Sequence, residues 1–127
     1  MGRSPLVILD GAHNPAGAEA LAASMQEVFT WERLHLVLAV SANKDVAGIV
    51  APLAPLADVV YAARNRSERS GEADVIADRF AAEDTPVVLF DTVTDALTAA
   101  LASAGAGDCV LVTGSLYTVA DARRTLT

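Results

Sequence analysis

The chain has 127 residues and a formal net charge of −7, and 53% of its residues are hydrophobic but only 5% aromatic. This length supports one domain, the acidic balance argues against nucleic-acid binding, and no apolar run approaches the roughly 20 residues of a membrane span. Since no signal-peptide pattern opens the chain either, we expect residues 1–127 to form a single cytoplasmic domain that binds neither a membrane nor nucleic acid.

The first apolar run, Leu6–Leu9, is followed directly by the turn Asp10-Gly11-Ala12-His13-Asn14-Pro15. Such a run is typical of a strand buried on both faces of a parallel sheet. Asn14 and Pro15 predict an N-cap and a first-turn proline, so a helix should begin at Pro15. The polar side chains of the turn would then lie beside helix amides that favour an anion. An ordinary Asp-Gly and Asn-Pro turn accounts for most of these residues, but it needs no imidazole at His13.

Strand and helix patterns alternate along the rest of the chain. The strand candidates are Leu6–Leu9, Leu34–Val40, Asp58–Tyr61, Val87–Phe90 and Cys109–Thr113. The helix candidates are Pro15–Val28, Asp45–Leu53, Glu72–Ala82, Thr94–Ala104 and a last helix from Leu116 to the terminus. This alternation predicts an α/β three-layer sandwich, with a mostly parallel sheet of five or six strands and helices on both faces. The polar stretch Arg64–Asp74 is the best candidate for a mobile loop.

Polar residues gather at the predicted carboxyl ends of the strands, whereas the amino ends are mostly apolar. These polar groups are Asp10–Asn14, Ser41–Asp45, Arg64–Arg66, Asp91–Thr92 and Thr113–Ser115. In a parallel sheet the carboxyl ends share one edge, and open α/β sheets bind ligands there, near a switch in strand order. The sequence therefore predicts one polar site along this edge.

Some of the polar residues also have simple structural explanations. Thr113-Gly114-Ser115 could offer free helix amides to a carboxylate or a phosphate, but it also fits an ordinary capped helix start. Lys44 and Asp45 could contact a charged ligand or form a solvated pair. His35 begins a strand away from the polar edge, so we interpret it as structural. Cys109 is the only cysteine, and its apolar neighbours predict a buried, inert thiol.

Several common catalytic motifs are absent from the sequence. It contains no G-x-x-x-x-G-K-[ST] loop for nucleotide phosphates and no G-x-G-x-x-G after the first strand. Two separated histidines and one cysteine give little support to a metal site. Gly114-Ser115-Leu116-Tyr117 does not match the G-x-S-x-G of a serine hydrolase. The polar edge therefore looks like half of a site that another domain completes.

Two motifs resemble one enzyme family. The stretch Leu9–Leu21, LDGAHNPAGAEAL, resembles the C-terminal-domain signature of folylpolyglutamate synthase and dihydrofolate synthase, which belong to the Mur ligase superfamily. The stretch Val112–Arg123, VTGSLYTVADAR, is similar to the closing motif of that family. Ala42-Asn43-Lys44-Asp45 lies where the family usually has D-K-D, so Asn43 is a departure from the pattern. The resemblance spans nearly the whole chain.

The resemblance implies a Rossmann-like module of a two-domain, ATP-dependent amide ligase of folate biosynthesis and one-carbon metabolism. In such enzymes ATP phosphorylates a folate or dihydropteroate carboxylate, and the amino group of L-glutamate attacks the acyl phosphate. The C-terminal domain offers the glutamate pocket. The implied cofactors are ATP and Mg²⁺, held mainly by an N-terminal P-loop ATPase domain that is absent from this chain.

The same resemblance implies roles for individual residues. His13 would be catalytic and would bind or orient glutamate together with Ser115, and Asp10 would contact ATP from across the domain cleft. Weaker candidates are Asn14 and Tyr117 for the substrate, and Lys44 and Asp45 for the nucleotide. No metal ligand is implied within the chain.

This interpretation predicts that the chain alone has no ligase activity and at most weak affinity for glutamate or nucleotide. Two alternatives stay open. The chain could be the C-terminal domain of another Mur-type or cyanophycin-type ligase that adds a different amino acid. It could also be a stand-alone small-molecule-binding or interaction module without a catalytic partner.

Overall fold

Strands and helices alternate along the chain in the computed structural model, which describes residues 5–65, 67 and 70–127. The elements are β1 (Leu6–Leu9), α1 (Pro15–Val28), β2 (Leu34–Leu38), α2 (Val46–Leu53), β3 (Val59–Ala62), α3 (Ala73–Ala82), β4 (Val87–Leu89), α4 (Val93–Ser103), β5 (Cys109–Thr113) and α5 (Leu116–Leu126). Each predicted element is found within about two residues of its expected bounds, and β1, α1 and β5 have the predicted bounds. The predicted α/β alternation is therefore confirmed.

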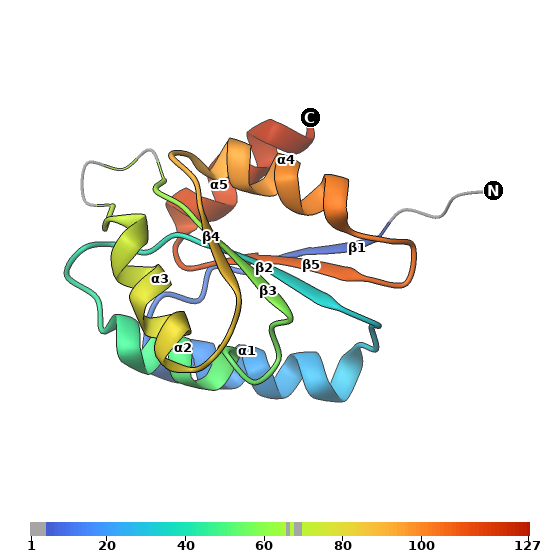
Figure 1. Cartoon of the computed structure of the whole chain (residues 1–127), viewed down its shortest axis with the longest axis horizontal. Helices are drawn as coiled ribbons and strands as arrows, with labels where there is room; N and C mark the ends of the chain where they lie inside the picture. Colours follow the sequence, from blue (N-terminus) through green and yellow to red (C-terminus); the bar gives the residue numbers. More distant parts are fainter. Residues whose placement is uncertain (1–4, 66, 68–69) are drawn as a thin grey trace.

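The strands of the described residues form one sheet in the order β1-β5-β2-β3-β4, and every neighbouring pair is parallel. Helices α1, α2 and α3 cover one face and α4 and α5 cover the other, which gives the three predicted layers (Figure 1). The carboxyl ends of all the strands consequently share one edge. There, the connections after β1 and β2 lead to one face, whereas the connection after β5, between them, leads to the other. This divergence is the switch in strand order at which open α/β sheets bind ligands.

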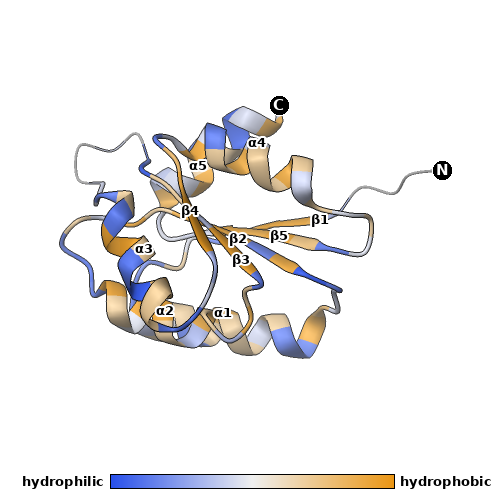
Figure 2. Ribbon diagram, in the orientation of Figure 1, coloured by the Kyte–Doolittle hydropathy of each residue, from blue (hydrophilic) through white to orange (hydrophobic). Residues whose placement is uncertain are grey.

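The central strands β2, β3 and β5 are buried on both faces, and alternate residues of one strand enter different cores. The edge strands β1 and β4 are only partly buried, so the expectation that Leu6–Leu9 is buried on both faces is wrong. In β2, Leu34, Leu36 and Leu38 pack into the core beneath α1, α2 and α3. Val37 packs into the second core, against α4. Figure 2 shows the central strands as hydrophobic along most of their length. This double burial explains why the central strands appear in the sequence as continuous apolar runs instead of alternating ones.

A series of hydrogen-bonded polar side chains is buried within the otherwise apolar interior of the sheet. His35 is 1% exposed, and its Nε2 donates to Asp108 Oδ2 at 2.9 Å, because a carboxylate only accepts. The Nδ1 of a neutral ring then accepts the Tyr61 hydroxyl proton at 3.0 Å. Asp108 Oδ2 also accepts from the Gly105 amide at 2.9 Å. The predicted structural role of His35 fits this position, at the amino-terminal end of the sheet and away from the polar edge.

We expect Asp108 to make stability depend on pH in the acid range. Hydrogen bonds from the Gly105 amide and from His35 hold the pKa of the Asp108 carboxyl below its ordinary value of 3.8. A lowered carboxyl pKa stabilises the fold above the ordinary value, and this stabilisation is lost as the pH falls through the folded-state pKa. Thermal melts from pH 6 down to pH 2.5 should therefore show a steeper fall in Tm for the wild type than for Asp108→Asn. Parallel melting curves for the two proteins below pH 4 would contradict the assignment.

Other expectations concern the thiol and the polar loop. Cys109 is fully buried, and this burial raises the pKa of its thiol to about 11, as an inert thiol requires. Residues 66, 68 and 69 of the predicted mobile loop lie outside the described residues. Within the described part of the chain, no helix has both the length and the apolar character needed to cross a membrane.

Candidate functional site

The turn between β1 and α1 is held by its own side chains. The Asp10 amide donates to Val112 O at 2.9 Å and so extends the ladder between β1 and β5. Asp10 Oδ1 accepts from the Ala12 amide at 2.8 Å. Asn14 is the N-cap of α1, and its Oδ1 accepts from the Gly17 amide at 2.7 Å, which confirms the predicted cap. The polar turn is therefore fixed before any ligand arrives.

His13 projects from this turn as an exposed side chain. Its Nδ1 lies 3.1 Å from Gly11 O. Because a carbonyl oxygen only accepts, Nδ1 must be the donor, and a neutral ring then carries its lone pair on Nε2. The turn thus selects the tautomer that presents a basic nitrogen at the end of the imidazole.

Gly114 allows the turn after β5 to lie against the turns after β1 and β2. Its φ is +122°, and a Cβ at this position would lie 2.1 Å from Ala39 O. Its amide donates to Ala12 O at 3.1 Å. Ser115 follows as the N-cap of α5. The glycine therefore brings the three polar turns together at the switch in strand order.

A pocket of about 240 Å³ lies between these turns. Its lining residues are His13, Ser41, Asn43, Lys44, Ser67, Ser115, Leu116 and Tyr117. They come from the connections that follow β1, β2, β3 and β5. The predicted convergence is confirmed for the polar groups after β1, β2 and β5, whereas Arg64, Asn65, Asp91 and Thr92 line a separate cavity along the same edge. Among the described residues that line the pocket between the turns there is a lysine and a histidine but no carboxylate, and this composition suits an anionic ligand.

Four of the seven candidate residues line this pocket, namely His13, Lys44, Ser115 and Tyr117. The other three, Asp10, Asn14 and Asp45, lie on the same turns but are not in its lining. Each of these accepts a hydrogen bond from a nearby backbone amide, as Asp45 Oδ1 does from Gly48 at 2.9 Å where it caps α2. Each of the two carboxylates retains a second oxygen for other partners.

The sequence did not reveal the hydrogen bonds of Asn65, which organise the pocket wall. Asn65 Nδ2 donates to Ser115 Oγ at 3.1 Å and to Thr118 Oγ1 at 3.2 Å. Asn65 belongs to the predicted polar edge, but a sequence gives no signal that its side-chain amide reaches the first turn of α5.

Leu116 and Tyr117, beside this wall, are 73% and 58% exposed. Two large exposed side chains at a pocket are typical of a surface that another domain or a partner covers.

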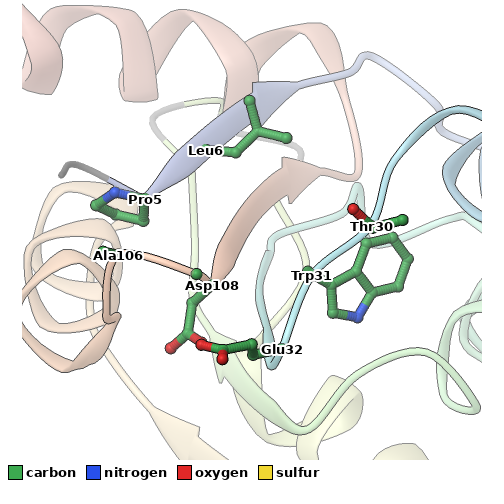
Figure 3. A pocket seen from close by; sticks show the side chains of 8 residues that line it. Pro5, Leu6, Thr30, Trp31, Glu32, Ala106 and Asp108 are labelled. Carbon is green, nitrogen blue, oxygen red and sulfur yellow. The ribbon is translucent and has the colours of Figure 1, made fainter.

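A larger cavity, of about 620 Å³, lies at the opposite end of the sheet. Figure 3 shows Trp31 on one side of it and the carboxylate groups of Glu32 and Asp108 on another. Two carboxylates would repel an anion, and Asp108 is already engaged by His35. This cavity also lies away from the switch in strand order. This larger cavity is therefore the weaker candidate for an anion-binding site.

Comparisons with known proteins show to which family this domain belongs. The family model described as the glutamate ligase domain of Mur ligases matches residues 1–116. A probable bifunctional folylpolyglutamate synthase/dihydropteroate synthase from Halobacterium salinarum is 41% identical over 126 residues, which is 97% of this chain and 15% of that protein.

Solved structures of the same branch have the same fold. FolC of E. coli, in complex with DHPP and ADP, aligns with a TM-score of 0.89 and 35% identity over 99% of this chain and 30% of that one. A bifunctional folylpolyglutamate synthase/dihydrofolate synthase with Mn, AMPPNP and L-glutamate bound aligns at 0.87 and 31%, with the same coverage. The chain thus spans less than a third of the length of these relatives. It belongs to the Mur ligase glutamate ligase domain family, in the branch formed by the folylpolyglutamate and dihydrofolate synthases.

Proposed function

We propose that the pocket between His13, Lys44 and the start of α5 binds L-glutamate. It does so within an ATP-dependent ligase that joins this amino acid to a folate or dihydropteroate carboxylate. The observation that carries the proposal is the pocket itself, which combines two basic side chains and no described carboxylate at the switch in strand order. The related enzymes bind DHPP and ADP in one structure, and L-glutamate with AMPPNP and Mn in another.

The chemistry of the substrate fits these residues. Glutamate carries two carboxylates, so it is attracted by the Lys44 ammonium and by the first-turn amides of Leu116 and Tyr117, which have no hydrogen-bond partner among the described residues. Its α-amino nitrogen forms the new bond to the acyl carbon, and phosphate leaves with the electron pair of the broken C–O bond. The nitrogen attacks only after its ammonium form has lost a proton. The lone pair on His13 Nε2 accepts that proton as a general base.

The remaining candidates have supporting roles in this proposal. Tyr117 borders the substrate, and Asn14 supports the turn that carries His13 by capping α1. Asp10 and Asp45 are on the side of the nucleotide. Lys44, expected from the resemblance to contact the nucleotide, lines the pocket and is assigned to glutamate instead. Ser115 orients the pocket wall, because its hydroxyl caps α5 by accepting from the Thr118 amide at 3.1 Å.

ATP supplies the phosphoryl group that activates the folate carboxylate. We assign the Mg²⁺ ligands mainly to another domain of the ligase, as the resemblance to the family implies. That domain would cover Leu116 and Tyr117 and exclude water from the acyl phosphate. The buried, unpaired Cys109 is compatible with the reducing cytoplasm.

Whether ligation needs another domain can be tested by measuring incorporation of labelled glutamate into dihydropteroate and into a reduced folate. The 127-residue chain alone should give no ATP-dependent product, whereas the full ligase that carries it should form one amide per ATP consumed. Ligation by the chain alone would contradict the proposed need for another domain. Preferential incorporation of aspartate or lysine by the full ligase would contradict the assignment of glutamate.

A further inference from the structure

The hydroxyl of Ser115 is fully used inside the protein. Thr118 Oγ1 donates its single proton to Ala39 O at 2.7 Å, since a carbonyl oxygen only accepts. In the contact of 3.0 Å between the two hydroxyls, Ser115 must then be the donor. Ser115 Oγ also accepts from the Thr118 amide and from Asn65 Nδ2, each at 3.1 Å. A hydroxyl has one proton and two lone pairs, so a ligand reaches this one only by displacing a partner.

Asn65 is the centre of this network. It is 7% exposed, and its Nδ2 donates to both hydroxyls, Ser115 at 3.1 Å and Thr118 at 3.2 Å. Its Oδ1 accepts from the Ser67 amide at 2.9 Å. Ser67 and Ser115 both line the pocket. One buried amide thus holds two parts of the pocket wall that come from different strands.

We propose that Asn65 is a positioning residue for glutamate, acting through Ser67 and Ser115 and touching no substrate itself. This inference rests on the proposed function of the pocket. Asn65 Oδ1 binds Ser67 in the connection after β3, and Asn65 Nδ2 binds Ser115 at the start of α5, so the side chain sets the spacing between these two segments. Thr118 passes the same constraint to the end of β2 through Ala39. Loss of the amide donors should therefore misplace the first-turn amides of α5 relative to Lys44.

The test uses Asn65→Asp and Asn65→Ala in the full ligase. Aspartate keeps the shape of the side chain and the oxygen that accepts from Ser67, but it replaces the Nδ2 donors with a second acceptor. Alanine removes the donors and the acceptor without adding charge. Both variants should raise KM for glutamate about 10- to 30-fold, the equivalent of two hydrogen bonds. KM for ATP should stay within about twofold, since the nucleotide does not depend on this wall. If Asn65 served folding alone, the variants would lower Tm but would not raise KM for glutamate relative to KM for ATP.

Controls separate the possible outcomes. Ser70→Ala is the matched control for Asn65→Ala. Ser70 Oγ accepts from the backbone N–H of Asn65 at 3.0 Å but contacts neither the Ser115 nor the Thr118 hydroxyl. This variant should leave KM for glutamate within about twofold. Thr118→Val, which removes one acceptor of the amide at nearly constant shape, should raise that KM about fivefold and serves where the Asn65 variants fold poorly. If the Asn65 and Thr118 variants leave KM unchanged while His13→Ala raises it, the positioning role is wrong and the proposed function stands. If His13→Ala leaves glutamate kinetics unchanged as well, the proposed function fails, and the positioning role fails with it.

Discussion

Replacing Gly114 with alanine should lower the free energy of unfolding by about 3 kcal/mol or more. The residue has a φ of +122°, a conformation that L side chains rarely adopt, and the added Cβ would lie 2.1 Å from Ala39 O. The obstructing atom belongs to the backbone at the end of a buried strand, so it cannot move aside as a flexible side chain would. Urea unfolding of the 127-residue chain, followed by circular dichroism, measures the loss.

Gly105→Ala is the matched control for this prediction. A Cβ at Gly105 would find its nearest neighbour, Asp108 Oδ2, at 3.8 Å, which is ordinary van der Waals contact. Its unfolding free energy should change by less than about 1 kcal/mol, the usual range for an exposed glycine replaced without strain. Equal effects of the two substitutions would mean that the turn after β5 does not constrain the edge of the sheet as described.

His13→Ala in the full ligase should lower kcat/KM for glutamate about 100-fold, at the lower end of the usual contribution of general base catalysis. The substitution removes the lone pair on Nε2 that the hydrogen bond to Gly11 O selects. It leaves the hydrogen bonds of Asp10 and Asn14 in the same turn in place. Initial rates at varied glutamate and saturating ATP and folate measure the effect.

His13→Gln separates proton transfer from positioning. Glutamine can place a polar amide near the position of Nε2 but cannot accept a proton at neutral pH. It should recover binding of glutamate, seen as a near-normal KM, without recovering kcat. An unchanged kcat/KM for glutamate in His13→Ala would overturn the catalytic assignment.

Local chemistry explains why several elements could be predicted closely from the sequence. Asn14 caps α1 and Pro15 occupies its first turn, so the start of that helix follows from two adjacent residues. The strand predicted over Leu34–Val40 ends instead at Leu38. Beyond this point the Ala39 amide reaches Thr113 O only at 3.4 Å, because the chain after β5 turns away at Gly114. A contact between residues so far apart in sequence gives no local signal.

The candidate site, too, could be predicted only in part from the sequence. Its location followed from the rule that parallel strands share their carboxyl ends, and His13 and Ser115 do line one pocket. The sequence did not reveal that the hydroxyl of Ser115 is occupied by Asn65 and Thr118. Nor did it give the strand order, because a helical crossover can place the next parallel strand at several positions in a sheet.

The central place of β5 has a consequence for biosynthesis. Within the described residues β1 pairs with β5 and with no other strand, so the first strand of this domain to be synthesised pairs only when the last one has been made. Until Cys109–Thr113 has been made, β1 has no hydrogen-bonding neighbour and β2 exposes one of its edges. Such long-range closure slows folding, and an interrupted translation product would present two apolar strands ready for aggregation.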